Sequence, residues 1–199
     1  MGDVPGALAD HPDRERWNAR YTAGYPVSFE PHPLAARAMA LRLPGGPVAD
    51  LACGASGSAL LAATAGRRVT AVDISDVALA LLSGEASRRG LAGLISVVQA
   101  DLRAWRPEPG GYALVLCTGY WDRTVFAVAT GAVRAGGLVG WESLTAEARR
   151  ERPGLCAGWC VNPGEPAALL PPGFAVLDQH DVPSPAHGTR RVLLARREG

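Results

Sequence analysis

Residues 48–75 read VADLACGASGSALLAATAGRRVTAVDIS, and this stretch decides the fold. The apolar run 48–53 predicts a strand, residues 54–57 predict a tight turn, and the Ala- and Leu-rich segment 58–65 predicts a helix. Gly66 ends that helix, and residues 69–72 predict a second strand that closes at Asp73. Strand, turn, helix and strand in this order indicate a doubly wound, mostly parallel α/β sheet.

The turn at Gly54 has the features of a nucleotide-type binding site. Small residues let backbone N–H groups and a helix N-terminus approach a ligand, and an acid after the second strand, here Asp73, accepts ribose hydroxyls. A dinucleotide site would need three glycines, whereas the corresponding positions hold Gly54, Ser56 and Ala59. Asp50, just before the turn, would repel a pyrophosphate and suits a cationic ligand. A nicotinamide-dependent oxidoreductase is therefore the disfavoured alternative.

The segment Asp50-Leu51-Ala52-Cys53-Gly54-Ala55-Ser56 resembles the first motif, hydrophobic-D/E-x-G-x-G-x-G, of the class I S-adenosylmethionine-dependent methyltransferases. Ala52 and Ser56 replace two of the family glycines, and both are small enough to leave the cleft open. The resemblance implies S-adenosyl-L-methionine, a sulfonium cation, as cofactor and S-adenosyl-L-homocysteine as product. It also implies a Rossmann-like three-layer α/β sandwich whose sheet has seven strands, mostly parallel, with an antiparallel last strand.

Residues 10–23 predict a helix ahead of the core, and a second helix is predicted at residues 31–43. The pattern Trp17-Asn18-Ala19-Arg20-Tyr21 in the first helix resembles a segment of small methyltransferases of the tellurite-resistance and thiopurine type, where it folds across the cofactor. The resemblance implies that Arg20 pairs with the methionyl carboxylate while Trp17 and Tyr21 close over it. The alternative is an amphipathic helix in which Arg20 is a surface charge and the rings are part of the core.

Residues 94–99 predict a third strand, and Asp101 follows it. In the family an acid at this position hydrogen-bonds the adenine amino group, although a solvated loop Asp or a helix cap is an open alternative. The full set of cofactor-binding residues that the resemblance implies is Trp17, Arg20, Tyr21, Asp50, Ala52, Gly54, Ser56, Asp73, Ile74, Asp101, Leu102, Cys117 and Thr118.

The acceptor is expected to meet the cofactor just after the apolar strand predicted at residues 112–117. Tyr120 and Trp121 lie there, and His187 lies in the loop between the last two predicted strands, so we assign these residues to the acceptor side. A hydroxyl acceptor would need a base, and His187, Glu142 and Asp122 are candidates. A loop histidine without a catalytic role is an equally open interpretation of His187.

The remaining elements complete the predicted sheet. A helix from residue 122 to about residue 133 precedes a strand at 138–142, and residues 143–173 are loop-rich with one short helix near 165–170. This loop-rich segment is expected to form part of a substrate lid. Strands at 174–178 and 191–195 are joined too closely for a crossover helix, which predicts an antiparallel hairpin.

Composition and charge narrow the class of protein. The chain of 199 residues predicts one methyltransferase domain, with residues 1–46 as an N-terminal helical lid or cap and 47–199 as the core. The formal net charge of +1 and the lack of an Asn/Asp-Pro-Pro-aromatic motif argue against a nucleic-acid partner. No signal-like or membrane-spanning apolar run is present, so the expectation is a cytoplasmic monomer or homodimer without a membrane partner.

Two other groups of residues can be interpreted either as functional sites or as ordinary structural and surface residues. Cys156 and Cys160 with His180 and His187 have loose spacing for zinc, so no metal site and no disulfide framework is predicted. The basic cluster Arg149, Arg150 and Arg152 indicates a solvated face, or a means of steering an anionic substrate.

The function predicted from the sequence is transfer of the methyl group of S-adenosylmethionine to a small-molecule acceptor by in-line displacement. The methylated atom, whether O, S, N or a metalloid, is undetermined. A non-catalytic S-adenosylmethionine-binding or partner-binding domain with the same fold is the alternative.

Overall fold

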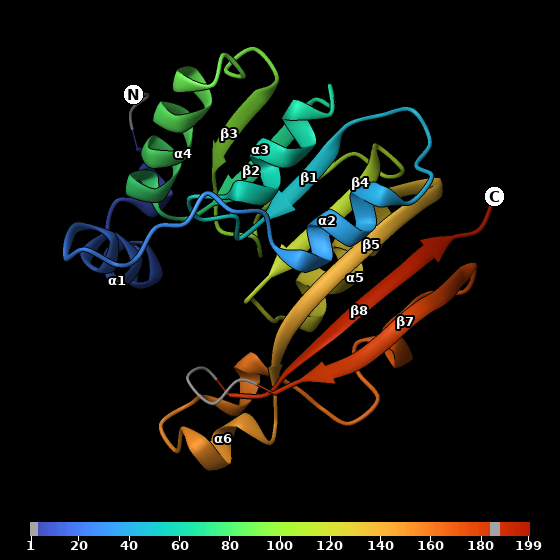
Figure 1. The fold of residues 1–199 in the computed structure, drawn as a ribbon. Coiled ribbons are helices and arrows are strands. Elements are labelled where there is room, and N and C mark those ends of the chain that lie inside the picture. Colours follow the sequence, from blue (N-terminus) through green and yellow to red (C-terminus); the bar gives the residue numbers. More distant parts are fainter. Residues whose placement is uncertain (1–3, 184–187) are drawn as a thin grey trace.

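A mostly parallel β-sheet runs through the middle of the molecule (Figure 1). The computed structural model describes residues 4–183 and 188–199. The strand order is β3-β2-β1-β4-β5-β8-β7, and a short strand, β6, pairs with β5 off this path. The strands are β1 (Val48–Leu51), β2 (Val69–Asp73), β3 (Ile95–Gln99), β4 (Tyr112–Thr118), β5 (Val133–Thr145), β6 (Cys160–Val161), β7 (Phe174–Val182) and β8 (Arg190–Arg197). β8 is antiparallel to both of its neighbours, which confirms the predicted sheet of seven main strands with an antiparallel last strand.

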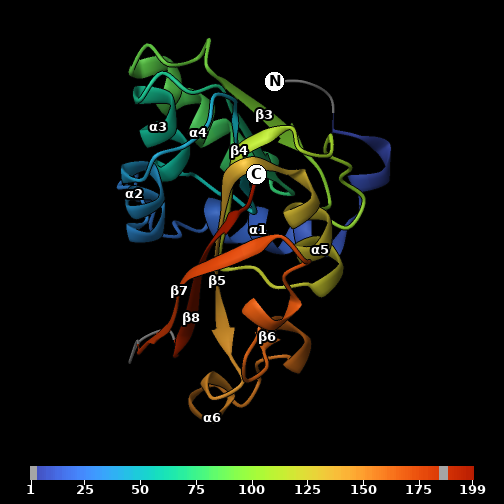
Figure 2. The same cartoon turned by 90° about the vertical axis from the view of Figure 1, so that its right-hand side faces the viewer.

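Helices cover both faces of this sheet, as predicted for a three-layer sandwich. Figure 2 shows α2 and α3 on one side of the sheet and α5 on the other, with α4 on the side of α3. The helices are α1 (Pro12–Thr22), α2 (Pro33–Ala40), α3 (Gly57–Thr64), α4 (Asp76–Arg88), α5 (Arg123–Ala132) and the one-turn α6 (Ala148–Glu151). Three 3₁₀ turns, η1 (Gly6–Leu8), η2 (Ala157–Trp159) and η3 (Ala167–Leu169), complete the elements. Among the described residues, no helix is long and apolar enough to cross a membrane.

Each face of the sheet has its own buried cluster. Leu60 of α3 and Leu82 of α4 pack with Leu114 and Leu138 on one face, and Leu34 and Ala38 of α2 join the same cluster. On the other face Phe126 of α5 packs against Trp141 at 5.1 Å between ring centroids. α2 is therefore part of the core, whereas α1, in the same N-terminal segment, contributes no fully buried residue.

The register of the parallel strands brings their carboxyl ends to one edge of the sheet. Leu51 at the end of β1 pairs with Val72 of β2 and with Cys117 of β4. Ala52, which follows β1, and Asp73 and Thr118, which end β2 and β4, therefore lie at this edge, where open α/β sheets bind ligands.

The structure differs from the sequence prediction mainly after β4. β5 begins at Val133 rather than near residue 138, with a register irregularity between its pairing to Tyr112 and to Leu114. The short helix predicted at 165–170 is only the 3₁₀ turn η3, and α6, η2 and β6 in the same segment were not predicted. β7 and β8 are longer than predicted because their backbone pairing continues through Gln179–Val182, where Asp181 lies opposite Arg191.

Gly57, the first residue of α3, allows the chain before α2 to cross the helix closely. A Cβ atom at Gly57 would overlap the carbonyl oxygens of Phe29 and Glu30, which are backbone atoms and cannot move aside alone. His32 continues this contact, since its backbone N–H donates to Ser58 Oγ at 3.1 Å. The absence of a side chain at Gly57 thus fixes the path by which residues 27–32 connect α1 to the core.

We expect Gly57→Ala to destabilise the protein by about 2 kcal/mol or more, because the new methyl group forces the backbone apart. Gly84→Ala is the matched control: Gly84 is exposed in the middle of α4, and a Cβ there meets nothing within 4 Å. This control should stabilise the fold by about 0.5–1 kcal/mol through helix propensity. Urea unfolding of both variants measures the two free energies, and equal effects would contradict the close crossing.

Candidate functional site

A cavity of about 720 Å³ opens at the carboxyl edge of the sheet, a size suited to a small ligand. α1, the ends of β1 to β4 and the segment after β5 form its walls. Its lining consists of Asp13, Arg16, Trp17, Arg20, Tyr21, Tyr25, Ala52, Cys53, Gly54, Asp73, Ile74, Ala100, Asp101, Leu102, Thr118, Gly119, Tyr120, Trp121, Leu144, Arg152, Leu155, Trp159 and Arg190. Every cofactor residue predicted from the sequence is in this lining except Asp50, Ser56 and Cys117.

The turn after β1 is the floor of the cavity, and it is strained at one residue. Gly54 has φ +58°, a conformation that suits glycine, and Ala52 has φ +49°. Ala52 is the only non-glycine residue with positive φ in the described part of the chain. Ala52 stands where the first motif of the class I methyltransferases has a glycine. Its methyl group is small enough to leave the cavity open, but the positive φ costs an alanine about 1–2 kcal/mol of conformational energy.

Asp73 is the last residue of β2 and holds the turn after β1 in place. Its Oδ2 accepts the backbone N–H of Gly54 at 2.8 Å, and its Oδ1 accepts the backbone N–H of Ser75 at 2.8 Å. Burial raises the pKa of this carboxyl group, while the N–H donors act in the opposite direction. Each oxygen of an ionised carboxylate has room for a second hydrogen bond, so Asp73 can still accept ligand hydroxyls.

Asp50 lies beneath the turn rather than on the cavity wall. It is 2 % exposed, and its Oδ2 accepts the hydroxyl of Ser56 at 2.5 Å. Ser56 Oγ in turn accepts the N–H of Ala59 at 3.0 Å as the N-cap of α3. Burial raises the pKa of Asp50 to about 6, although the Ser56 hydrogen bond lowers it. Asp50 and Ser56 therefore hold the turn and the helix N-terminus in place. Cys117 is buried inside β4.

α1 docks beside Asp73 through polar contacts. Arg14 Nε and Asn18 Nδ2 both donate to Asp76 Oδ1 at 2.8 Å, and Ser75 Oγ donates to Asn18 Oδ1 at 2.7 Å. Ser75 and Asp76 begin α4 directly after the Asp73 loop. Since no residue of α1 is fully buried, these hydrogen bonds carry much of the docking. The sequence interpretation did not include Asn18 or Arg14, because a contact across so many residues has no local signal.

The inner face of α1 presents aromatic rings to the cavity. Trp17, Tyr21 and Tyr25 pack at 5.5–6.4 Å between centroids, and the Arg20 guanidinium lies 4.9 Å from the Trp17 ring centroid. The Tyr21 hydroxyl lies so close to Gly54 that a Cβ there would come within 2.5 Å of it. Burial and the Asp73 charge raise the pKa of Tyr21 to about 12, so its phenol stays neutral. The structure thus places Tyr21 over the turn and puts Trp17 and Arg20 in the lining of the same cavity.

Asp101 lines the cavity after β3, together with Leu102 and Ile74. His11 Nε2 lies 3.7 Å from Asp101 Oδ2, and Arg103 contacts the same carboxylate at 3.3 Å. The His11 ring also accepts the N–H of Asp13 through Nδ1 as the N-cap of α1. Asp101 is therefore a cavity residue that is also joined to the start of α1.

Tyr120 and Trp121, which the sequence assigned to the acceptor side, both line the cavity. Burial and the nearby Asp122 carboxylate raise the pKa of Tyr120, so its phenol is neutral and can serve as a hydrogen-bond donor. Trp121 is 3 % exposed and packs against Phe126 and Trp141, and its Nε1 is a buried donor without a partner among the described residues. His187 lies outside the described residues.

The other two candidate bases have partners of their own. Glu142 is buried, with Oε1 2.7 Å from Arg190 Nη1 and Oε2 3.1 Å from His32 Nε2. Burial acts to raise its pKa, but the hydrogen bonds from His32 and Arg190 outweigh burial and lower it. Asp122 caps α5, as predicted, by accepting the N–H groups of Thr124 and Val125. Both carboxylates therefore have structural roles.

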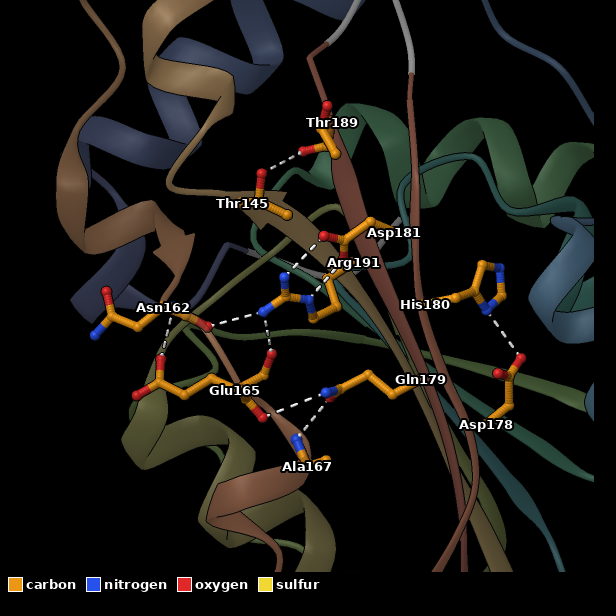
Figure 3. A network of polar contacts seen from close by, with 11 residues as sticks. Thr145, Asn162, Glu165, Ala167, Asp178, Gln179, His180, Asp181, Thr189 and Arg191 are labelled. Carbon is orange, nitrogen blue, oxygen red and sulfur yellow. Dashed lines mark hydrogen bonds and ion pairs between the residues drawn. The ribbon is translucent and has the colours of Figure 1, made fainter.

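The segment after β5 forms the far wall of the cavity with Leu144, Arg152, Leu155 and Trp159. Figure 3 shows how the end of this segment is held: Arg191 of β8 binds Asp181 at 2.6 and 2.8 Å and donates to the carbonyl oxygens of Asn162 and Glu165. The Glu165 carboxylate also pairs with Arg123 of α5 at 2.9 Å. The segment is thus fastened to the hairpin and to α5.

Among the described residues, no group of three or more His, Cys, Asp or Glu side chains is arranged to hold a metal ion. Cys156 is exposed and Cys160 is buried, and both are free thiols. The lining residues that were not predicted as site residues are Asp13, Arg16, Tyr25, Cys53, Ala100, Gly119, Leu144, Arg152, Leu155, Trp159 and Arg190. Cys53 lies within the first motif and Arg152 within the basic cluster, but neither was assigned to the cavity.

Comparison with known protein families matches part of the chain. Residues 48–137, which are slightly less than half of it, match the family model described as a methyltransferase domain. No curated protein sequence matches the chain.

Solved structures with the same fold include 1,6-didemethyltoxoflavin-N1-methyltransferase of Burkholderia thailandensis, with S-adenosylhomocysteine and its substrate bound. It has 20 % identity and a TM-score of 0.69, and the match covers 100 % of this chain and 94 % of that one. TehB of Haemophilus influenzae has 13 % identity and a TM-score of 0.69, with 91 % and 67 % covered. A structure described as "Conversion of a Disulfide Bond into a Thioacetal Group during Echinomycin Biosynthesis" has 19 % identity and a TM-score of 0.70, with 94 % and 93 % covered. These likenesses confirm the Rossmann-like fold.

The buried Asp50 predicts a specific dependence of stability on pH. Because its folded pKa of about 6 exceeds the ordinary value of 3.8, the folded state binds more protons than the unfolded state between those values. The contribution of Asp50 to stability is therefore most favourable below pH 4 and is lost as pH rises to 6. In the parent protein this effect lowers the free energy of unfolding by about 2 kcal/mol between pH 4.5 and pH 7, and Asp50→Asn should remove that decrease.

Urea unfolding at the two pH values measures this difference. Asp10→Asn, at an exposed position, is the control and should behave as the parent protein does. A pH dependence that is the same in all three proteins would mean that Asp50 is not the buried acid described here.

Proposed function

We propose that this methyltransferase transfers the methyl group of S-adenosylmethionine to a small-molecule acceptor by in-line displacement. The observation that carries the proposal is the meeting of Gly54, Asp73, Asp101 and Arg20 on one cavity at the carboxyl edge of the sheet. The methyltransferase domain match at residues 48–137 supports it. So does the B. thailandensis enzyme of the same fold, which was crystallised with S-adenosylhomocysteine and a small-molecule substrate.

The cavity residues suit the parts of this cofactor. Asp73, with a free acceptor site on each oxygen, is proposed to accept the ribose hydroxyls. Asp101 is proposed to bind the adenine amino group, with Ile74 and Leu102 as apolar neighbours. Arg20 is the cation proposed for the methionyl carboxylate, and the neutral Tyr21 phenol lies over the turn beside it.

Bound S-adenosylmethionine supplies a sulfonium-activated methyl group, which a nucleophile attacks from the side opposite to the sulfur. The residues of this chain then contribute to catalysis by positioning the two reactants and by excluding water from the cavity. We propose that α1 serves as the lid, because it lies over Gly54 and is docked by polar contacts without a fully buried residue. Tyr120 is proposed to orient the acceptor through its neutral hydroxyl, beside the wall that Trp121 forms. For a hydroxyl acceptor, His187 remains the proposed base.

The W-x-x-R-Y segment, now placed on the cavity wall, supports the finer proposal of a tellurite-resistance or thiopurine-type branch. That branch methylates small molecules, and the acceptor atom stays open among O, S, N and a metalloid.

Two measurements test the proposed function. Calorimetry should show binding of S-adenosylhomocysteine and none of NAD. Incubation with S-adenosylmethionine labelled in its methyl group and a panel of thiols, phenols, amines and metalloid oxyanions should yield a labelled product. Binding without transfer to any acceptor would favour a non-catalytic binding domain, and binding of NAD alone would refute the proposal.

The role of Arg20 predicts a difference between two ligands. Arg20→Ala should weaken S-adenosylhomocysteine roughly tenfold or more, since a charged hydrogen bond contributes about 1.5–3 kcal/mol. It should barely change the affinity for 5′-methylthioadenosine, which lacks the carboxylate. Arg16→Ala is the matched control from the same helix, where the guanidinium pairs with Asp13 at 3.0 Å, and it should not distinguish the ligands. If Arg20→Ala weakens both ligands equally, Arg20 only supports the helix.

A further inference from the structure

The two ends of the cavity differ in charge. The acids of the lining are Asp13 of α1, Asp73 of β2 and Asp101 after β3, and α1 also contributes the cations Arg16 and Arg20. The end formed by β5, β8 and the segment between β5 and β7 has no lining acid among the described residues, and it contributes two cations, Arg152 and Arg190. In the sheet, Arg190 pairs with Leu144 of β5, whereas β2 and β3 lie on the far side of β1 and β4. Arg152 and Arg190 therefore stand apart from the residues proposed for the adenosine part of the cofactor.

The hydrogen bond to Glu142, which His32 also holds, fixes the position of Arg190 and leaves some of its N–H groups available to a ligand. Its Nη1 binds Glu142 Oε1 at 2.7 Å, and His32 holds the other Glu142 oxygen. His32 accepts the N–H of Leu34 through Nδ1, so the proton on Nε2 is directed at Glu142. Within the described residues, Nε and Nη2 of Arg190 have no hydrogen-bond partner, and 31 % of the side chain is exposed. A guanidinium fixed in this way can bind an oxyanion with two parallel hydrogen bonds at little entropic cost.

Apolar side chains line the same end of the cavity as Arg190. Leu144 and Leu155 line this end, and Leu155 is packed in a small cluster with Ala148 and Cys160. The Trp159 ring closes it, stacked at 4.9 Å against the guanidinium of Arg16 from α1. The wall is thus suited to a flat or apolar body that ends in a negative group.

We propose that the methyl acceptor carries an oxyanion, either a carboxylate or a phosphate, that binds Arg190, and an apolar body that packs on Leu144, Leu155 and Trp159. This inference rests on the proposed function and adds the class of acceptor to it. Glu142 and His32 are positioning residues for Arg190.

The test compares charged probes with neutral counterparts on protein saturated with S-adenosylhomocysteine. Indole-3-acetate and indole-3-acetamide form the carboxylate pair, and phenyl phosphate and dimethyl phenyl phosphate form the phosphate pair. We expect at least one anion to bind about tenfold or more tightly than its neutral counterpart. The pair that shows the difference identifies the carboxylate or the phosphate as the recognised group.

Variants assign the preference to Arg190. Arg190→Gln should reduce the preference for the anion to about twofold or less, and Arg190→Lys should restore part of it, since a point charge replaces the fork. Arg150→Gln, which removes the same charge from an exposed position outside the cavity lining, should leave the preference unchanged. Affinity for S-adenosylhomocysteine should stay within about twofold in all three variants, which separates Arg190 from the cofactor site.

Three outcomes would overturn the inference. They are equal binding of anions and neutral counterparts to the parent protein, a preference that survives in Arg190→Gln, and no binding of any anion at about 1 mM. Because the first and third are measured on the parent protein, they hold even if Arg190→Gln does not fold. Failure of the parent protein to bind S-adenosylhomocysteine would instead defeat the proposed function.

Discussion

The hydrogen bond from the Gly54 N–H to Asp73 Oδ2 joins the end of one strand to the turn after its neighbour, and the cavity depends on it. The turn between β1 and α3 presents backbone N–H groups at the carboxyl edge of the sheet. Asp73 accepts one of these N–H groups, while Asp50, through Ser56, caps the helix from below. Two buried carboxylates therefore support a turn that contains the positive φ of Ala52. Burial raises the pKa of both carboxyl groups. Raised carboxyl pKa values and backbone strain are both common at functional sites.

The walls above this turn are held by weaker means than the sheet below it. α1 is docked by hydrogen bonds to Ser75 and Asp76 and by a cluster of rings, and it meets the far wall through the stacking of Arg16 on Trp159. Such contacts can open and reform at a small cost in free energy, unlike the packing of Leu60 and Leu114 in the core. Ligand entry is therefore compatible with a sheet that does not move.

Much of the fold was predictable because its signals are local. The strand, turn and helix of residues 48–65 follow from an apolar run, a glycine turn and an Ala/Leu-rich segment, and Asp73 is placed by the strand that follows. The short elements between β5 and β7 were not predictable, because contacts far apart in sequence hold them. Arg191 donates to the Asn162 carbonyl and Gln179 accepts the Ala167 N–H, and no local sequence pattern predicts either hydrogen bond. For the same reason Trp159 and Arg190 were missed as cavity residues, whereas Tyr120 and Trp121 were found from their place after a central strand.

The walls of the cavity are divided along the chain. The lining residues up to Trp121 include Gly54, Asp73 and Asp101, and those from Leu144 onward come from β5, β8 and the segment between β5 and β7, with Arg16 of α1 stacked on Trp159 across the two groups. The family match at residues 48–137 covers lining residues of the first group only. In protein-engineering terms the chain is modular: the segment between β5 and β8 can be replaced or lengthened without changing the residues of the turn after β1, and the junction at the end of β5 is the place to make such an exchange.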